Sequence, residues 1–147
     1  MFKVPTFKKS KGQTLVEIIL AVAVAITVIV ALVTLSVSAM RYAQSSMMRS
    51  VGEKLATGGI EAVRITRNNS VTGYDDILSG TYQVSDGVLS PCSTGFCEIN
   101  YGNYKFTRKI SVSGEVANSY KNIYVEVRWQ EGAGERKVYL SSRIYKY

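Results

Sequence analysis

The fold of this chain is decided by residues 11–40, which read KGQTLVEIILAVAVAITVIVALVTLSVSAM. Glu17 is the only acid in this stretch, and residues 18–40 contain no charged side chain. About 20 apolar residues are enough for a helix that crosses a bilayer. Lipid enforces a helix despite the many Val and Ile residues, because backbone groups there must bond internally. The stretch therefore predicts a membrane-spanning helix with a single carboxylate at its head.

A basic leader precedes this segment. Residues 1–12 carry four lysines and no acid. Lysines that flank a membrane segment stay in the cytoplasm, so the C-terminal part of the chain is predicted to lie outside. A carboxylate at the head of such a segment costs a few kcal/mol unless it is paired, which makes Glu17 a functional candidate. The alternative is a polar residue at the membrane edge that only reaches the lipid headgroups.

The order of these parts is unusual for a signal sequence. In an ordinary secretory signal the apolar region precedes the cleavage site and is discarded, whereas here the small residue Gly12 comes first. Gly12 is followed by Gln13, Thr14, Leu15 and, after one further residue, Glu17. Over the first third of the chain, this order resembles the class III signal of type IV prepilins and pseudopilins. That pattern is a basic leader, Gly, a residue that is often Phe, Thr-Leu-x-Glu and a hydrophobic helix.

The resemblance implies a processing and assembly mechanism. A prepilin peptidase would cut between Gly12 and Gln13 and methylate the new amine of Gln13. Glu17 lies one helical turn further on, and the two opposite charges, on the same or neighbouring subunits, would neutralise each other in a filament core. Thr14 and Leu15 belong to the same assembly motif. The implied partners are the peptidase, other pilin subunits, an inner-membrane assembly platform and membrane lipid.

Two departures from the family pattern favour a minor pilin over a major one. Gln13 stands where Phe is usual, and the proline that major pilins often carry in the helix is missing, with Thr34 near that position. The interpretation is a membrane-inserted minor type IV pilin-like subunit that is later displayed on the cell surface. The alternatives are a pseudopilin of a type II secretion or competence system, and a single-pass anchored binding domain that does not polymerise. Nucleic acid would be a partner only in a competence pilus.

Composition argues against several other classes of protein. Removing the four leader lysines from 18 basic side chains leaves 14 against 11 acidic ones, a net charge of +3, which is low for a dedicated nucleic-acid binder. The chain has no histidine, phosphate loop or nucleophile motif, so no enzyme activity and no cofactor are predicted. The ten tyrosines resemble a stacking surface for a ligand or DNA, but strands favour aromatic residues for structural reasons alone.

The fold class predicted is α+β, with a long N-terminal hydrophobic helix packed against a small C-terminal antiparallel sheet. The predicted helix covers residues 13–57, of which 13–40 form the membrane or filament-core part and 41–57 an amphipathic part. Gly58 and Gly59 are the first plausible break, although residues 60–67 could add another turn or two. The apolar stripe predicted to rest on the globular head, residues 58–147, comprises Met40, Gln44, Met47, Met48, Val51 and Leu55.

Period-two alternation predicts the sheet. Residues 123–129 and 138–144 should form a hairpin, with Ile123, Val125, Val127 and Trp129 on one face. Residues 104–112 form a third strand in which Arg108 is a misfit among inward-facing apolar residues. Residues 96–101 are a weaker candidate. The region 68–90 is predicted to be rich in loops, with one short strand at 81–84.

Cys92 and Cys97 are predicted to form a disulfide, because both lie on the outer side and close together. A metal site would need two more ligands, and a redox motif would need another spacing. Asp75, Asp76 and Asp86 suggest calcium but lack the order of an EF-hand loop. No metal site is therefore predicted.

Overall fold

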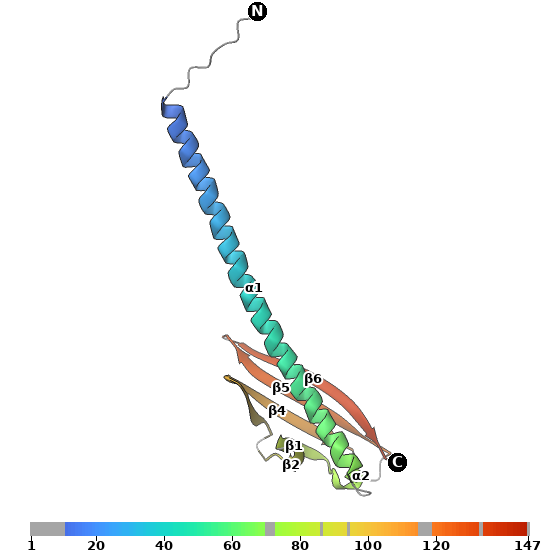
Figure 1. Cartoon of the computed structure of the whole chain (residues 1–147). Helices are drawn as coiled ribbons and strands as arrows, with labels where there is room; N and C mark the ends of the chain where they lie inside the picture. The colour runs from blue at the N-terminus through green and yellow to red at the C-terminus, as the bar shows by residue number, and fades with distance from the viewer. Residues whose placement is uncertain are drawn as a thin grey trace, which may run out of the picture. The chain divides into compact units, whose positions relative to one another are not determined.

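The computed structural model describes residues 11–69, 73–85, 87–93, 95–114, 119–132 and 134–146. Figure 1 shows the elements in chain order. They are α1 (Lys11–Asn68), α2 (Gly73–Asp76), β1 (Gly80–Ser85), β2 (Val88–Pro91), β3 (Cys97–Tyr101), β4 (Tyr104–Ser113), β5 (Tyr120–Glu131) and β6 (Gly134–Tyr145). The chain divides into two compact units, Met1–Gln44 and Ser45–Tyr147.

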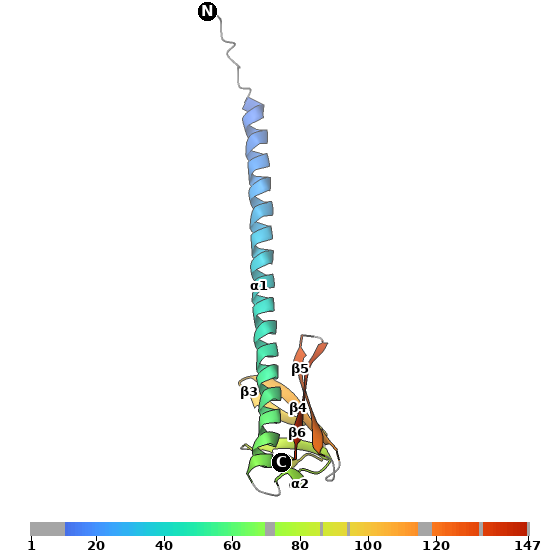
Figure 2. The same cartoon turned by 90° about the vertical axis from the view of Figure 1, so that its right-hand side faces the viewer.

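The second unit contains one antiparallel sheet of six strands, of which five lie in the order β2-β1-β4-β5-β6 and the sixth, β3, pairs with β4. Strands β1 and β3 pair with successive parts of one edge of β4, and β5 pairs with the other edge. The C-terminal part of α1 lies along one face of this sheet (Figure 2). The α+β fold predicted from the sequence, a long apolar helix packed on an antiparallel sheet, is confirmed.

The core lies between the sheet and the part of α1 that belongs to the second unit, here called the packed part (residues 45–68). Alternate residues of β4 and β5 face the helix, as the period-two pattern predicts. The buried core residues from these elements are Met48, Val51, Ala56, Ile60, Val63, Phe106, Ile110, Val112, Ile123, Val125, Val127 and Trp129. The predicted face of residues 123–129 is therefore confirmed.

Two glycines allow the packed part of α1 to approach the sheet closely. A Cβ atom on Gly52 would lie 2.9 Å from Cζ3 of Trp129. A Cβ atom on Gly59 would lie 3.2 Å from side-chain carbons of both Ile110 and Val125. Both glycines are buried and stand seven residues apart, on the same face of a helix. Backbone surface therefore replaces side chains at the closest contacts of the helix with the sheet.

The helix does not break at Gly58 and Gly59, where the sequence indicated the first plausible end, but continues to Asn68. Glycine costs about 1 kcal/mol relative to alanine inside a helix. Packing offsets this cost at Gly59, which lies on the sheet, whereas Gly58 faces open space. The alternative considered for residues 60–67, further helical turns, is the one observed.

The predicted apolar stripe was partly wrong. Met48 and Val51 are buried and Leu55 is half-buried, but Met40, Gln44 and Met47 are exposed. The first two lie in the first unit, and Met47 precedes the line of small residues that meets the sheet. The helix face that packs is set by Gly52 and Gly59, which a count of apolar side chains overlooks.

The predicted hairpin is confirmed with Val125 opposite Leu140 and Val127 opposite Val138. The candidates at 104–112, 96–101 and 81–84 correspond to β4, β3 and β1. Strand β2 and the short helix α2 lie in the region predicted to be rich in loops. The misfit Arg108 is buried among the core residues, where its guanidinium donates to the carbonyl oxygens of Leu55 on α1 (3.0 Å) and Val84 on β1 (3.4 Å).

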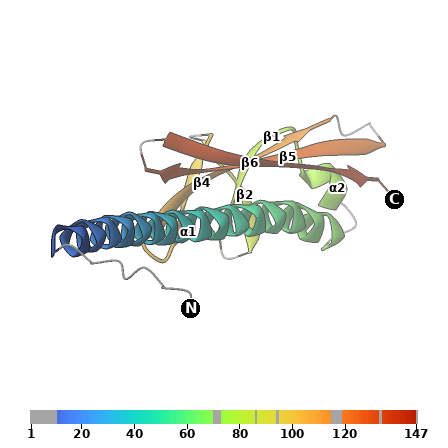
Figure 3. The same ribbon diagram turned by 90° about the horizontal axis from the view of Figure 1, so that it is seen from above.

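A buried lysine holds α2 against the end of the sheet. Lys121 is fully buried, and its ammonium donates to the carbonyl oxygens of Tyr74 and Ile77. Burial lowers the pKa of Lys121, an effect that the nearby carboxylate of Asp75 opposes. Lys146 adds a 2.9 Å ion pair to Asp75. Figure 3 shows α2 beside the C-terminal end of β6, where these contacts occur.

Candidate functional site

The predicted processing site lies at the start of the described chain. Gly12 and Gln13 are within α1, but their side chains are outside the described residues, as is the leader up to residue 10. Thr14, Leu15 and Glu17 follow on the first turns of α1 and are exposed. The helix therefore presents the carboxylate of Glu17 and the side chain of Leu15 to its surroundings. Cleavage, methylation and filament assembly remain predictions for these residues.

The rest of the first unit is an apolar helix with its side chains exposed. By length and composition, α1 can cross a membrane, and within the part of the chain that the structure describes, none of its most apolar segment is buried. The large apolar side chains exposed between residues 15 and 40 are Leu15, Val16, Ile18, Ile19, Leu20, Val22, Val24, Ile26, Val28, Ile29, Val30, Leu32, Val33, Leu35, Val37 and Met40. A contiguous apolar surface of this extent marks a site of contact with a membrane or another protein.

Three hydroxyl groups in the apolar part of α1, defined here as residues 14–44, are satisfied within the helix itself. Thr34 donates to the carbonyl oxygen of Val30 at 2.8 Å. Ser36 and Ser38 donate in the same way to carbonyls four residues earlier, at 2.9 Å each. An unsatisfied polar group costs several kcal/mol in hydrocarbon. These internal bonds make the apolar part of α1 compatible with lipid or with a bundle of helices.

The predicted disulfide between Cys92 and Cys97 is confirmed. Cys92 follows the end of β2, and Cys97 is the first residue of β3. The backbone N–H of Cys92 also donates to the carbonyl oxygen of Thr81 on β1 at 2.9 Å. The bridge therefore closes the connection between two strands that pair with different neighbours, and its role is structural.

The carboxylates weighed for calcium do not form a site in the described part of the chain. Asp75 is engaged by the ammonium of Lys146, and Asp86 lies outside the described residues. Across the described residues, no three carboxylate or cysteine side chains gather closely enough to hold a metal ion.

Comparisons of the chain with protein-family models, with curated proteins and with solved structures found no match. The architecture itself is pilin-like, because a long apolar N-terminal helix packs through its C-terminal part on an antiparallel sheet.

Sequence reasoning missed the structural roles of three residues. Lys121 lies two residues before Ile123 and four before Val125, so it shares the inward face of β5 with them. This period-two spacing was the signal that could have predicted its burial. Gly52 and Gly59 carried a signal in their helical spacing. Neither signal names the contact partner, which comes from a distant part of the chain.

Proposed function

We propose that this chain is a membrane-inserted, pilin-like structural subunit that is cleaved after Gly12 and assembles into a surface filament through its N-terminal helix. The observation that carries the proposal is the exposed apolar part of α1 with Glu17 at its head, in a chain whose second unit has a buried core of its own. A subunit whose apolar helix surface has no partner among the described residues needs one from outside. Lipid would supply it before assembly, and the helices of other subunits afterwards.

In this proposal the acid has a defined role. After cleavage, the carboxylate of Glu17 would meet an α-amine of Gln13 inside the helix bundle and so set the position of the incoming subunit. The role is assembly and display without catalysis, and prepilin peptidase and an inner-membrane platform would act on the chain. A minor subunit of a type IV pilus is the specific form proposed.

The Glu17→Ala variant tests this assignment in the cells that make the protein. Cleavage should persist, while the amount of the chain in sheared filaments should fall about tenfold or more, because the α-amine then lacks its buried partner. Glu61→Ala is the matched control, since it removes an exposed acid from the packed part of the same helix. Normal incorporation of Glu17→Ala would contradict the assignment and favour an anchored domain that does not polymerise.

A further inference from the structure

The sheet has a second face, on the side away from α1. Among the described residues, the ring of Phe96 lies over part of this face, with its centre 4.1 Å from the guanidinium of Arg128 and 5.6 Å from the ammonium of Lys109. Alternate residues of β4, β5 and β6 point to this face. On this face, residues that pair across β4, β5 and β6 form two rows. Ser111, Tyr124 and Ser141 pair in one row, and Lys109, Glu126 and Tyr139 pair in the next.

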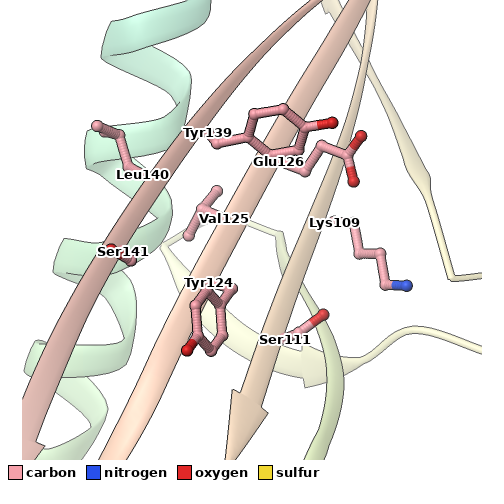
Figure 4. Close-up of a pocket in the computed structure, with 8 residues that line it drawn as sticks. All are labelled: Lys109, Ser111, Tyr124, Val125, Glu126, Tyr139, Leu140 and Ser141. Atoms are coloured by element: carbon pink, nitrogen blue, oxygen red, sulfur yellow. The ribbon is translucent and has the colours of Figure 1, made fainter.

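A hollow of about 490 Å³ lies over these two rows. It is lined by the six side chains just named together with Val125 and Leu140, and Figure 4 shows them on three neighbouring strands. The volume falls in the range of roughly 300 to 1,000 Å³ that is typical of small-molecule sites. Tyr124 is 54% exposed and Tyr139 is 58% exposed. Their positions are diagonal across β5 and β6, with Cβ atoms roughly 7 Å apart.

The polar groups of the hollow are held in place by their neighbours. The guanidinium of Arg128 donates to the carboxylate of Glu126 at 2.7 Å, and the Glu126 side chain is only 18% exposed. A hydrogen bond with Tyr139 raises the pKa of Lys137, whose ammonium lies 5.4 Å from the centre of the Tyr139 ring. The ion pair leaves the carboxylate of Glu126 little freedom to lose when a ligand binds.

The chemistry of the hollow favours one class of ligand. Exposed tyrosine rings offer flat apolar faces with a polar tip, which suit the C–H face of a sugar ring. Around them stand acceptors and donors that match sugar hydroxyls: the carboxylate of Glu126, the ammonium of Lys109 and the hydroxyls of Ser111 and Ser141.

A nucleic acid fits this hollow less well. Stacking aromatic residues on single strands are normally combined with a positively charged groove. Here the carboxylate of Glu126 lies in the middle of the hollow, between Lys109 and Tyr139 in its row. Arg128 already pairs with this carboxylate at 2.7 Å, so the two charges offset each other, and Lys109 is the one cation among the described residues that line the hollow. A single cation does not make the positively charged groove that a nucleic acid requires, whereas the carboxylate oxygens can accept hydrogen bonds from neutral sugars. We propose that the outer-face hollow around Tyr124, Glu126 and Tyr139 binds a neutral oligosaccharide.

The test uses the full chain, in a detergent with a zwitterionic headgroup so that no sugar detergent competes for the hollow. The protein is applied to an array of printed neutral hexose oligosaccharides, and the best-retained sugar is then titrated in solution. Tyr124→Ala and Tyr139→Ala should each weaken binding about tenfold, since each removes a stacking ring, and Glu126→Gln about fivefold, since it replaces one acceptor oxygen by a donor.

Tyr101→Ala is the matched control, because Tyr101 is an exposed tyrosine on β3 that does not line the hollow. The fluorescence of Trp129, the single tryptophan, shows whether each variant is folded. Three outcomes would overturn the proposal: no printed sugar is retained, sugar binding survives the Tyr124 and Tyr139 variants, or the chain retains single-stranded oligothymidylate and no sugar. The test needs no filament, so its result is independent of the assembly proposal.

Discussion

The apolar part of α1 (residues 14–44) and its packed part (residues 45–68) belong to one continuous helix but satisfy their apolar side chains in different ways. In the first part, large aliphatic residues are exposed on all sides. In the second part, Gly52 and Gly59 make the closest contacts with the sheet, and most apolar side chains are buried in the core of the same chain, although Met47 and Ile65 are exposed. The difference teaches that apolar content alone does not separate the two parts. Glycines at the positions of closest approach let the packed part bury its apolar side chains against the sheet, whereas the first part leaves its apolar side chains exposed.

The largest expected effect on stability comes from a substitution in the packed part of α1. Gly59→Leu places a side chain where Ile110 and Val125 already lie 3.2 Å from a Cβ position, so it should lower the free energy of unfolding by about 3 kcal/mol. The melting temperature, followed by Trp129 fluorescence in detergent, should fall by roughly 15 °C.

Gly58→Leu is the matched control for this prediction. Nothing lies within 4 Å of a Cβ atom on Gly58, so the variant should stabilise the helix by about 0.5 kcal/mol through propensity alone. Equal melting temperatures for the two variants would show that Gly59 does not lie against the sheet.

A smaller effect is expected for Lys121→Met, which keeps the length of the side chain but leaves the carbonyl oxygens of Tyr74 and Ile77 without their donor. The free energy of unfolding should fall by about 2 kcal/mol. Exposed Lys105→Met is the control and should leave it unchanged.

The stability difference between the wild type and Lys121→Met should also depend on pH. Because burial lowers the pKa of Lys121, the folded chain releases this proton at a lower pH than the unfolded chain does. The stability of the wild type relative to Lys121→Met should therefore rise with pH in the alkaline range just below the ordinary lysine value. A difference that stays constant over this range would contradict the buried state of the ammonium.

The smallest expected effect belongs to the apolar part. Thr34→Val removes a hydroxyl that donates to the carbonyl oxygen of Val30, one helical turn away. The free energy of unfolding of the globular unit should therefore change by less than about 0.5 kcal/mol. The variant should still insert into membranes, as tested by extraction of the membrane fraction. A loss of melting temperature like that of Gly59→Leu would mean that the two parts are coupled.

The sequence predicted the elements that have a strong period and missed those that depend on distant partners. The run of apolar residues and the alternation on β4, β5 and β6 gave the fold class, the hairpin and its inward face. The end of α1 was placed too early, because Gly59 weakens a helix locally and is explained only by Ile110 and Val125 on the sheet. Strand β2 and helix α2 lacked a period altogether.

The candidate site residues also fall into those that the sequence predicted and those that depend on distant partners. Glu17 and the apolar surface were evident from the order of residues, and Cys92 and Cys97 from their spacing. For the outer-face hollow, the only indication in the sequence was the number of tyrosines. Its composition follows from the register that sets Tyr124 beside Ser141 and Glu126 beside Tyr139, and a single strand does not contain that information.

The central claim is that the apolar part of α1 is delivered to a filament by prepilin processing. The most direct test is intact-mass and N-terminal peptide mass spectrometry of the protein isolated from its own cells. The account predicts a mature chain that begins at Gln13 and is one methyl group heavier than its sequence. A chain that still begins at Met1 in cells with an active prepilin peptidase would contradict it and make the leader a cytoplasmic tail.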